Sequence, residues 1–352
     1  MKIKFVQCRK INLQSSADPG KSSWLDYLQV YKFSVRGTEN NKIKGGNKKM
    51  LKGIIAAMAT KFTPDGEHVD GQATVQLVEQ MIADGVHGIV VGGSTGEFFT
   101  MTAEERKQQI DLVVKTVNKR VPVVAHSGCL STRETVEMSK YCEAAGADVI
   151  IVVPSFYEAL SERELIAHYA AIGAATKMPV MLYNIPTSSS NDILAGTAAK
   201  LVQVCNATCM KDSTGDLHRL YRITAATNGQ VQAICGADSI LMQAFAYGAQ
   251  AAVLGVANAI TRECVALYKL MVEQNDLVTA RQLWDKFLPF QEFAETHGYI
   301  AVVKAACAYK GRDVGAPRQP ILPLSAADQT EMEALLRELD TMSPLVDKVL
   351  AQ

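Results

Sequence analysis

The residues best suited to chemistry in this sequence stand at the ends of short apolar segments. The segment 207–211 ends in Lys211, and Asp212 follows directly. Lysine is seldom fully buried, so this residue either pairs with an acid or uses its amine. Burial favours the neutral form of an amine, which attacks a ketone or aldehyde to form an imine. From position alone, an ion pair between Lys211 and an acid such as Asp212 is the commoner explanation, so the neighbouring residues have to decide.

Residues 92–98, with the sequence GGSTGEF, form a candidate anion-binding turn. Small residues and successive backbone N–H groups at a strand-to-helix turn can bind one carboxylate or phosphate, and Ser94 and Thr95 add hydroxyl donors. The segment lacks the G-K-[ST] ending of a P-loop. Beside an imine-forming amine, such a turn predicts a 2-oxo acid substrate, whose carboxylate lies at the turn and whose carbonyl meets Lys211.

Two further segments end in residues that can move or donate a proton. Tyr183 begins the sequence YNIP, and a phenol near an imine can act as acid or base during imine formation and carbon–carbon cleavage. His126 ends another apolar run and could bind a substrate hydroxyl or carboxylate. Taken singly, a tyrosine spanning core and surface and a packed histidine are the commoner roles for these two residues.

These side chains can act together only in a fold that brings the ends of several strands close to one another. Continuous apolar, β-branched runs fit strands covered on both faces, hence a parallel sheet. The eight runs are 53–60, 88–93, 121–128, 148–154, 178–184, 207–211, 231–236 and 251–256. Hydroxyl-to-glutamate spacings typical of helix starts recur at Thr102, Ser131 and Ser161. Eight strands alternating with helices predict a closed (β/α)8 barrel, whereas an open doubly wound sheet would normally carry a G-x-G-x-x-G turn after its first strand.

The sequence predicts three parts. Residues 1–49 hold eleven basic and three acidic residues without clear periodicity, and form a basic N-terminal extension that is disordered or not part of the fold. Residues 50–275 form the barrel with its closing helix. Residues 276–352 form C-terminal helices packed on the barrel. These helices are expected near 278–294, 296–310 and 325–350.

Composition restricts the partners and the location. The 352 residues contain 36 basic and 36 acidic residues, so neither nucleic acid nor an anionic membrane is indicated as a partner. No apolar run approaches the roughly 18 residues of a membrane span, and no secretory signal is present. The eight cysteines include no C-x-x-C pair and the histidines do not cluster, which indicates reduced thiols and gives no support to a metal site. A cytoplasmic enzyme without metal is predicted.

Four motifs stand in an order and at a spacing that resemble one family. They are GGSTGEF (92–98), YNIP (183–186), MKDSTGD (210–216) and KGRDVGAPRQPILPLS (310–325). Over residues 51–340 the chain resembles the superfamily of dihydrodipicolinate synthase and N-acetylneuraminate lyase, the class I Schiff-base aldolases. The resemblance implies a (β/α)8 TIM barrel with a C-terminal helical extension, and chemistry that needs no external cofactor because the protonated imine itself withdraws electrons.

The resemblance also implies roles for individual residues. Lys211 forms the imine with pyruvate or with the pyruvate-like end of a substrate. Thr95 and Ser94 hold the carboxylate, and Tyr183 moves protons with Ser94 as part of a relay. Further substrate-binding positions are implied at Gly93, Ser213, Gly236, Asp238 and Val256.

The resemblance requires one more aromatic hydroxyl in this relay. Tyr157 is the candidate, although its loop is one residue longer than the common pattern and Phe156 occupies the other aromatic place. In the family this residue can come from a neighbouring subunit. A homo-oligomer is therefore expected, a homotetramer built as a dimer of dimers.

Departures from the family patterns bear on the substrate. Ser188 stands where dihydrodipicolinate synthases usually carry an arginine that binds the second substrate's carboxylate, and Ser239 stands where neuraminate lyases tend to carry glutamate. The segments SGCLSTRETVEM and MKDSTGDLHRL look nearer to 4-hydroxy-2-oxoglutarate aldolase and the 2-keto-3-deoxy sugar-acid aldolases.

The sequence therefore predicts an aldolase that cleaves or forms a carbon–carbon bond of a 2-oxo acid, with pyruvate and an aldehyde as partners. Three alternatives remain open. They are a dihydrodipicolinate synthase, a 2-oxo acid dehydratase or deaminase on the same scaffold, and a 2-oxo acid sensor without turnover.

Overall fold

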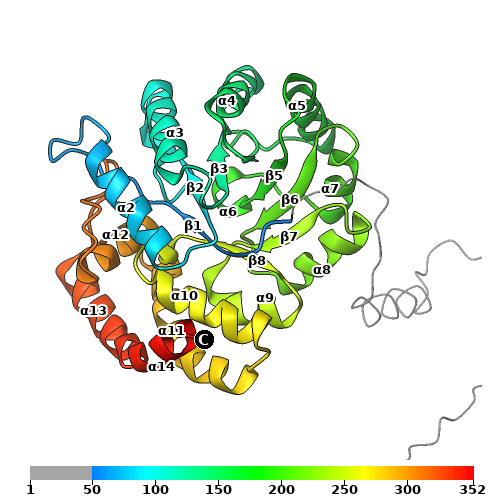
Figure 1. Cartoon of the computed structure of the whole chain (residues 1–352). Coiled ribbons are helices and arrows are strands. Elements are labelled where there is room, and N and C mark those ends of the chain that lie inside the picture. Colours follow the sequence, from blue (N-terminus) through cyan, green and yellow to red (C-terminus); the bar gives the residue numbers. More distant parts are fainter. Residues whose placement is uncertain (1–49) are drawn as a thin grey trace, which may run out of the picture. The chain divides into compact units, whose positions relative to one another are not determined.

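Eight parallel strands close into a barrel in the computed structural model, which describes residues 50–352 (Figure 1). The predicted extension at 1–49 lies outside the described residues. The strands follow one another around the barrel in chain order, and β1 pairs with β8 to close it. Their bounds are β1 (Gly53–Ala57), β2 (Gly88–Val91), β3 (Val123–His126), β4 (Val149–Val152), β5 (Val180–Asn184), β6 (Ala207–Asp212), β7 (Gln232–Cys235) and β8 (Ala251–Leu254). The predicted (β/α)8 TIM barrel is confirmed.

Helices surround the strands and separate them along the chain (Figure 1). The helices are α2 (Gly71–Ala83), α3 (Ala103–Val117), α4 (Thr132–Ala145), α5 (Glu162–Ala175), α6 (Pro186–Ser189), α7 (Ala195–Leu201), α8 (Leu217–Ala226), α9 (Leu241–Ala246) and α10 (Thr261–Tyr268). Short 3-10 turns follow β2, β7 and β8, namely η1 (Phe98–Thr100), η2 (Asp238–Ile240) and η3 (Val256–Asn258), and a π turn, η4 (Lys269–Glu273), follows α10. Thr102 and Ser161 form complete capping boxes at the starts of α3 and α5.

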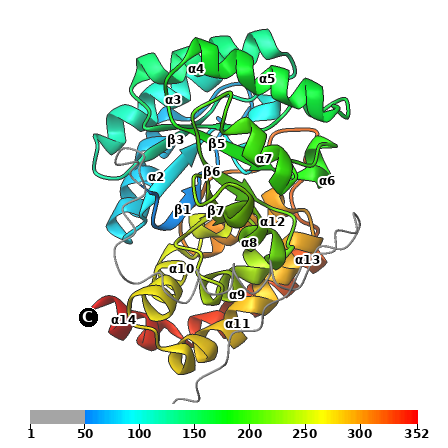
Figure 2. The ribbon, with the colours of Figure 1, turned by 90° about the vertical axis from the view of Figure 1, so that its right-hand side faces the viewer.

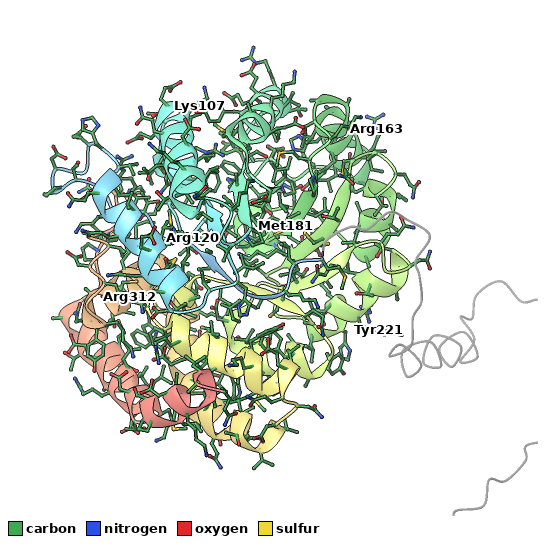
Figure 3. The ribbon with its side chains drawn as sticks, viewed as in Figure 1. Lys107, Arg120, Arg163, Met181, Tyr221 and Arg312 are labelled. Carbon is green, nitrogen blue, oxygen red and sulfur yellow. The ribbon has the colours of Figure 1, made fainter. Side chains whose placement is uncertain are left out.

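The interior of the barrel is filled by one side of each strand. All eight strands contribute to it, with Ile55, Val90, Val124, Ile151, Met181, Cys209, Ile234 and Val253. In Figure 3, Met181 lies within the ring of helices, whereas Lys107 and Arg163 lie at its outer edge. Side chains alternate between the two faces of a strand, so residues two positions further on also face inward. This alternation places His126, Tyr183 and Lys211 in the inner layer nearest the carboxyl ends of the strands, where the active sites of such barrels are built.

Four helices follow the barrel (Figure 2). They are α11 (Leu277–Thr296), α12 (Tyr299–Tyr309), α13 (Ala326–Asp340) and α14 (Ser343–Leu350). Helix α11 packs on α12, α13 and η2, and α14 packs on α10. The segment expected as one helix at 325–350 is two helices, because the chain turns at Thr341 and Met342, and the second helix begins at Ser343 with Pro344 in its first turn. The domain boundary predicted at residue 275 stays a prediction.

The described part of the chain has no helix that is both long and apolar enough to cross a membrane. The cytoplasmic location predicted from the sequence stays a prediction.

Gly173 tests how closely α5 packs against the chain before β6. A Cβ atom at this position would lie 2.3 Å from the carbonyl oxygen of Val204 and 2.7 Å from Cα of Cys205. Backbone atoms cannot move aside as a flexible side chain can, so Gly173→Ala is expected to lower the free energy of unfolding by about 1–3 kcal/mol. Thermal and urea unfolding followed by circular dichroism measure this loss.

Gly196 in α7 is the matched control, since a Cβ atom there meets nothing within 4 Å. Gly196→Ala is expected to stabilise the protein by up to about 1 kcal/mol, because alanine loses less backbone entropy in a helix. Unfolding of Gly173→Ala at the wild-type midpoint would contradict the close packing of α5.

Candidate active site

Lys211 and Tyr183 face each other on neighbouring strands at the mouth of the barrel. The two residues are directly paired in the register of β5 and β6. Lys211 Nζ lies 3.3 Å from Tyr183 Oη and 4.4 Å from the centre of the tyrosine ring. The residues are only 7% and 3% exposed. An almost buried amine therefore lies within reach of a hydroxyl that can donate or accept a proton.

Gly236, at the end of β7, leaves room for the lysine side chain. A Cβ atom at Gly236 would lie 2.7 Å from Cγ and 2.8 Å from Cε of Lys211, and 2.5 Å from Oγ of Ser213. The Ser213 hydroxyl donates a 2.8 Å hydrogen bond to the Gly236 carbonyl. The stem of Lys211 is thus enclosed by β5 on one side and by the end of β7 on the other.

The turn at 92–98 meets the end of β8 beside these residues. Thr95 is buried, Gly93 is buried, and Ser94 is partly exposed. Thr95 Oγ1 would lie 2.9 Å from a Cβ atom on Gly255, so the turn after β2 and the turn after β8 touch. The structure therefore brings the predicted anion-binding turn to the same end of the barrel as Lys211.

The end of this turn is held by a buried ion pair. Glu97 adopts the left-handed conformation with φ 58°, and its Oε1 lies 2.5 Å from Nζ of Lys304 in α12. Both side chains are almost completely buried. Glu97 Oε2 also accepts the backbone N–H of Arg318 at 2.7 Å, and Lys304 donates to the Ala316 carbonyl at 2.9 Å. Burial lowers the pKa of Lys304, while the Glu97 carboxylate opposes this shift.

Tyr299 is a residue of this region that no sequence motif indicated. From the start of α12, its hydroxyl donates to Asp238 Oδ2 at 2.7 Å and accepts the backbone N–H groups of Gly255 at 2.9 Å and Val256 at 3.2 Å. Burial raises the pKa of Asp238 to about 7 and that of the Tyr299 phenol well above its usual value. Tyr299 reaches this region only through contacts with residues far earlier in the chain, and the spacing of residues along the sequence does not predict such contacts.

His126 lies in the inner layer but is completely buried. Arg106 donates to its carbonyl at 2.9 Å and approaches Nδ1 at 3.3 Å. Because a guanidinium only donates, Nδ1 is the acceptor and the ring is neutral. Burial, Arg106 and Lys211 hold the pKa of His126 well below its usual value. The ring packs on Phe98, with centroids 4.2 Å apart, which favours a packing role.

Tyr157 is the predicted catalytic residue that does not lie beside Lys211 and Tyr183 in the single chain. Its side chain is 85% exposed in the loop after β4. The adjacent Phe156 instead packs edge-on against Phe98, with ring centroids 5.5 Å apart. Val256, the last of the predicted binding positions, is fully buried.

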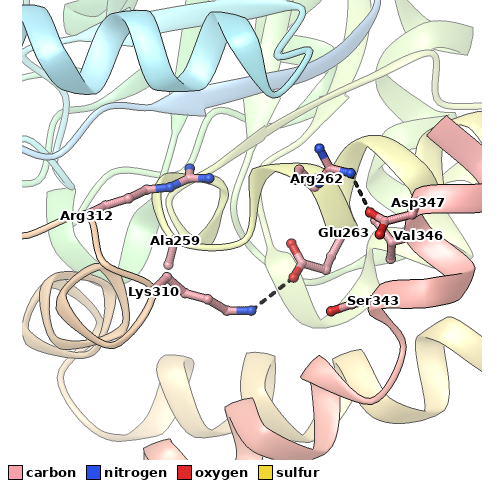
Figure 4. A pocket seen from close by; sticks show the side chains of 8 residues that line it. All are labelled: Ala259, Arg262, Glu263, Lys310, Arg312, Ser343, Val346 and Asp347. Carbon is pink, nitrogen blue, oxygen red and sulfur yellow. Dashed lines mark hydrogen bonds and ion pairs between the residues drawn. The ribbon is translucent and has the colours of Figure 1, made fainter. Parts of the chain in front are cut away.

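A separate cavity of about 200 Å³ lies between α10, α14 and the residues that follow α12 (Figure 4). It is lined by Ala259, Arg262, Glu263, Lys310, Arg312, Ser343, Val346 and Asp347. Its charged side chains are paired, since Arg262 lies 2.6 Å from Asp347, Lys310 lies 3.1 Å from Glu263, and Arg312 pairs with Asp84 outside the lining. None of the predicted site residues lines it, so the barrel mouth is the candidate active site.

Comparison with known proteins decides the family. The model of the dihydrodipicolinate synthetase family matches residues 50–339. The chain belongs to this family. The resemblance inferred from the motifs is thereby confirmed, and so is the prediction of a Schiff-base enzyme, since members of the dihydrodipicolinate synthetase family are Schiff-base lyases and synthases.

Individual members of the family are similar to the chain over most of its length. The 4-hydroxy-tetrahydrodipicolinate synthase 2 of Halalkalibacterium halodurans is 35% identical over 286 residues, which are 81% of this chain and 97% of that protein. The chloride-inhibited dihydrodipicolinate synthase of Acinetobacter baumannii, solved with pyruvate, is 29% identical with a TM-score of 0.78, covering 83% of this chain and 99% of that one. A prophage protein of the family from E. coli K12, also solved with pyruvate, is 28% identical with the same TM-score and the same coverages.

The ion pair between Lys304 and Glu97 yields a stability prediction. Lys304→Met leaves the Glu97 carboxylate buried without its cation, so we expect the free energy of unfolding to fall by about 3–5 kcal/mol. Denaturant unfolding measures the change.

The matched control is Lys286→Met, because Lys286 pairs with Glu338 at 2.7 Å while the two side chains stay 43% and 63% exposed. Such a surface pair contributes about 1 kcal/mol at most. Equal losses in the two variants would show that the Glu97 site is open to water.

Proposed function

We propose that this member of the dihydrodipicolinate synthetase family forms an imine between Lys211 and pyruvate, and makes or breaks a carbon–carbon bond through that imine. The observation that carries the proposal is the buried Lys211 Nζ lying 3.3 Å from Tyr183 Oη. The pyruvate bound in two solved members of the family supports pyruvate as one substrate.

The neighbouring groups supply each step of imine formation. The neutral amine of Lys211 attacks the carbonyl carbon, and the resulting hydroxyl leaves as water after taking a proton from the Tyr183 phenol. The iminium then draws electrons from the adjacent carbon, which can lose a proton to the phenolate and become a nucleophilic enamine. Thr95, Ser94 and the backbone N–H groups near Gly93 bind the carboxylate throughout.

Attack of this enamine on an aldehyde forms the new bond, and the reverse sequence releases pyruvate. The names of the relatives favour the synthase alternative over the aldolase that the sequence predicts. Ser188, exposed in α6, still offers no positive charge for the second carboxylate of a synthase substrate. Condensation of pyruvate with aspartate semialdehyde is therefore the first reaction to test, and cleavage of 4-hydroxy-2-oxoglutarate is the second.

The exposure of Tyr157 supports a working unit of more than one chain. A tyrosine that is 85% exposed in a loop at the rim of the barrel is available to a second copy of the chain. We propose that Tyr157 completes the proton relay in a neighbouring subunit of a homo-oligomer.

Borohydride reduction in the presence of pyruvate tests the imine directly. The full chain is expected to gain one reduced pyruvate on Lys211, located by peptide mass spectrometry, because borohydride converts an imine to a stable amine. Lys211→Arg keeps the charge but is expected to give no adduct. Tyr183→Phe is expected to lower kcat by about 100-fold or more through loss of the proton donor.

A substrate panel distinguishes the reactions that share the imine. Consumption of pyruvate with aspartate semialdehyde identifies a synthase, and pyruvate release from 4-hydroxy-2-oxo acids or 2-keto-3-deoxy sugar acids identifies an aldolase. A dehydratase consumes such acids without releasing pyruvate. Binding of pyruvate without an adduct on Lys211 would overturn the proposed imine and favour a sensor.

A further inference from the structure

One buried side chain makes the hydrogen bonds that hold the loop carrying Tyr157. The loop spans residues 155–160, between β4 and α5. Tyr157 is 85% exposed and is not fixed by packing of its own, while Phe156 adds a ring contact with Phe98. Within residues 50–352, every hydrogen bond that joins this loop to other parts of the chain ends on Asn191. The position of the loop therefore depends on this asparagine.

The side-chain amide of Asn191 is fully engaged by backbone groups. Asn191 lies after α6 and is 3% exposed. Its Nδ2 donates to the carbonyls of Ser155 at 2.7 Å and Glu158 at 3.1 Å, and its Oδ1 accepts the backbone N–H of Leu160 at 2.7 Å. Nδ2 also donates to the Ser189 carbonyl at 2.7 Å. Only an amide offers both donors and an acceptor in this shape, since a carboxylate can only accept.

The residues after Asn191 connect this loop to the strand that carries Tyr183. Asp192 Oδ1 accepts the side-chain N–H of Asn184 at 3.1 Å, and Ile193 donates its backbone N–H to Asn184 Oδ1 at 2.8 Å. Asn184 is fully buried and follows Tyr183 directly at the end of β5. The same short segment therefore binds the loop on one side and the end of β5 on the other.

We propose that Asn191 is a positioning residue of this active site, which sets the loop so that the Tyr157 phenol can serve the proton relay. The inference rests on the proposed function, in which Tyr157 completes that relay. Because its amide is engaged by the backbone, Asn191 acts through the loop and not on the substrate. No motif indicated Asn191, since its partners in the loop lie 31 to 36 residues earlier in the chain.

The step that this loop serves can be followed with pyruvate alone. In the imine with Lys211, a carbon–hydrogen bond of the methyl group breaks, its electrons form the carbon–carbon double bond of the enamine, and the iminium nitrogen becomes neutral. The proton passes to the Tyr183 phenolate and exchanges with solvent through the relay. In heavy water the reverse step returns a deuteron to the same carbon. The rate at which pyruvate gains deuterium therefore reports proton transfer, with no aldehyde present.

The test measures this deuterium uptake by proton NMR for the full chain and its variants. Asn191→Asp keeps the shape and the acceptor oxygen but loses the N–H groups and sets a carboxylate oxygen against carbonyls, so the loop shifts. The maximal rate is expected to fall about tenfold, because small misplacements of reacting groups are costly. The half-saturating pyruvate concentration is expected to stay within about twofold, because the carboxylate-binding turn is unchanged.

A double variant distinguishes this positioning role from a general loss of stability. Tyr157→Phe is expected to lower the maximal rate by about 100-fold through loss of the phenol. If Asn191 acts through Tyr157, adding Asn191→Asp to Tyr157→Phe causes no further loss, because residues that act as one unit are not additive. Multiplied losses would overturn the inference. So would a slow Asn191→Asp beside an unimpaired Tyr157→Phe.

Asn206→Asp is the matched control. Asn206 also donates from Nδ2 to a loop carbonyl, that of Lys177 at 3.0 Å, but it precedes β6 and so lies at the end of that strand away from Lys211. Its rate of deuterium uptake is expected to match the wild type. A loss as large as that of Asn191→Asp would contradict a specific role of the 155–160 loop.

A second measurement needs no turnover. Asn191→Ala removes the acceptor of the Leu160 N–H, so the peptide covering 155–160 is expected to exchange its amide hydrogens about tenfold faster, as measured by mass spectrometry. Unchanged protection of this peptide would overturn the inference. Borohydride trapping of pyruvate on Lys211 keeps the two proposals apart. An adduct together with wild-type deuterium uptake in Asn191→Asp rejects only the positioning role, whereas no adduct in the wild type rejects the proposed function itself.

Discussion

The register between β5 and β6 is the constraint on which this site depends, because it sets Lys211 directly beside Tyr183. Each of the eight strands buries at least one side chain of the interior cluster, and the same alternation turns the next residue on that face toward the mouth. A slip of one residue in β6 would turn the lysine toward the helices, with no phenol beside it. Packing of apolar side chains below the mouth therefore fixes the geometry of the polar ones above it.

The helices that follow the barrel in the chain also contribute side chains to the carboxyl end of the barrel. Helix α12 supplies Lys304 to the end of the turn after β2, and it supplies Tyr299 to the ends of β7 and β8. These contacts join turns that the strands alone leave separate. Glu97 holds a left-handed conformation that few residues adopt, and its carboxylate is bound by both Lys304 and the backbone of Arg318.

Local patterns predicted the barrel well because each strand and each helix start carries its own signal. Continuous apolar runs marked all eight strands, and serine or threonine followed by glutamate marked the starts of α3 and α5. The motif at 92–98 and the residues Lys211 and Tyr183 were predicted as site residues from the same kind of signal, because each stands at the end of an apolar run. Tyr299 was missed because its partners lie 43 to 61 residues earlier in the chain, and no spacing along the sequence encodes such a contact. The break between α13 and α14 was missed because the apolar pattern continues through it.

The partners of the buried ionisable groups separate structural from chemical roles. Lys304 is matched by an ion, Glu97, so a change of charge on either side would leave an uncompensated charge in the interior. Lys211 and Asp238 are instead matched by phenols, since Lys211 Nζ lies 3.3 Å from Tyr183 Oη and the Tyr299 hydroxyl donates to Asp238 Oδ2. A neutral partner lets the group change its charge without stranding an opposite one. In the same buried region, the ion pair of Lys304 and Glu97 therefore holds the turn after β2, while Lys211 and Asp238 are bound to neutral phenols.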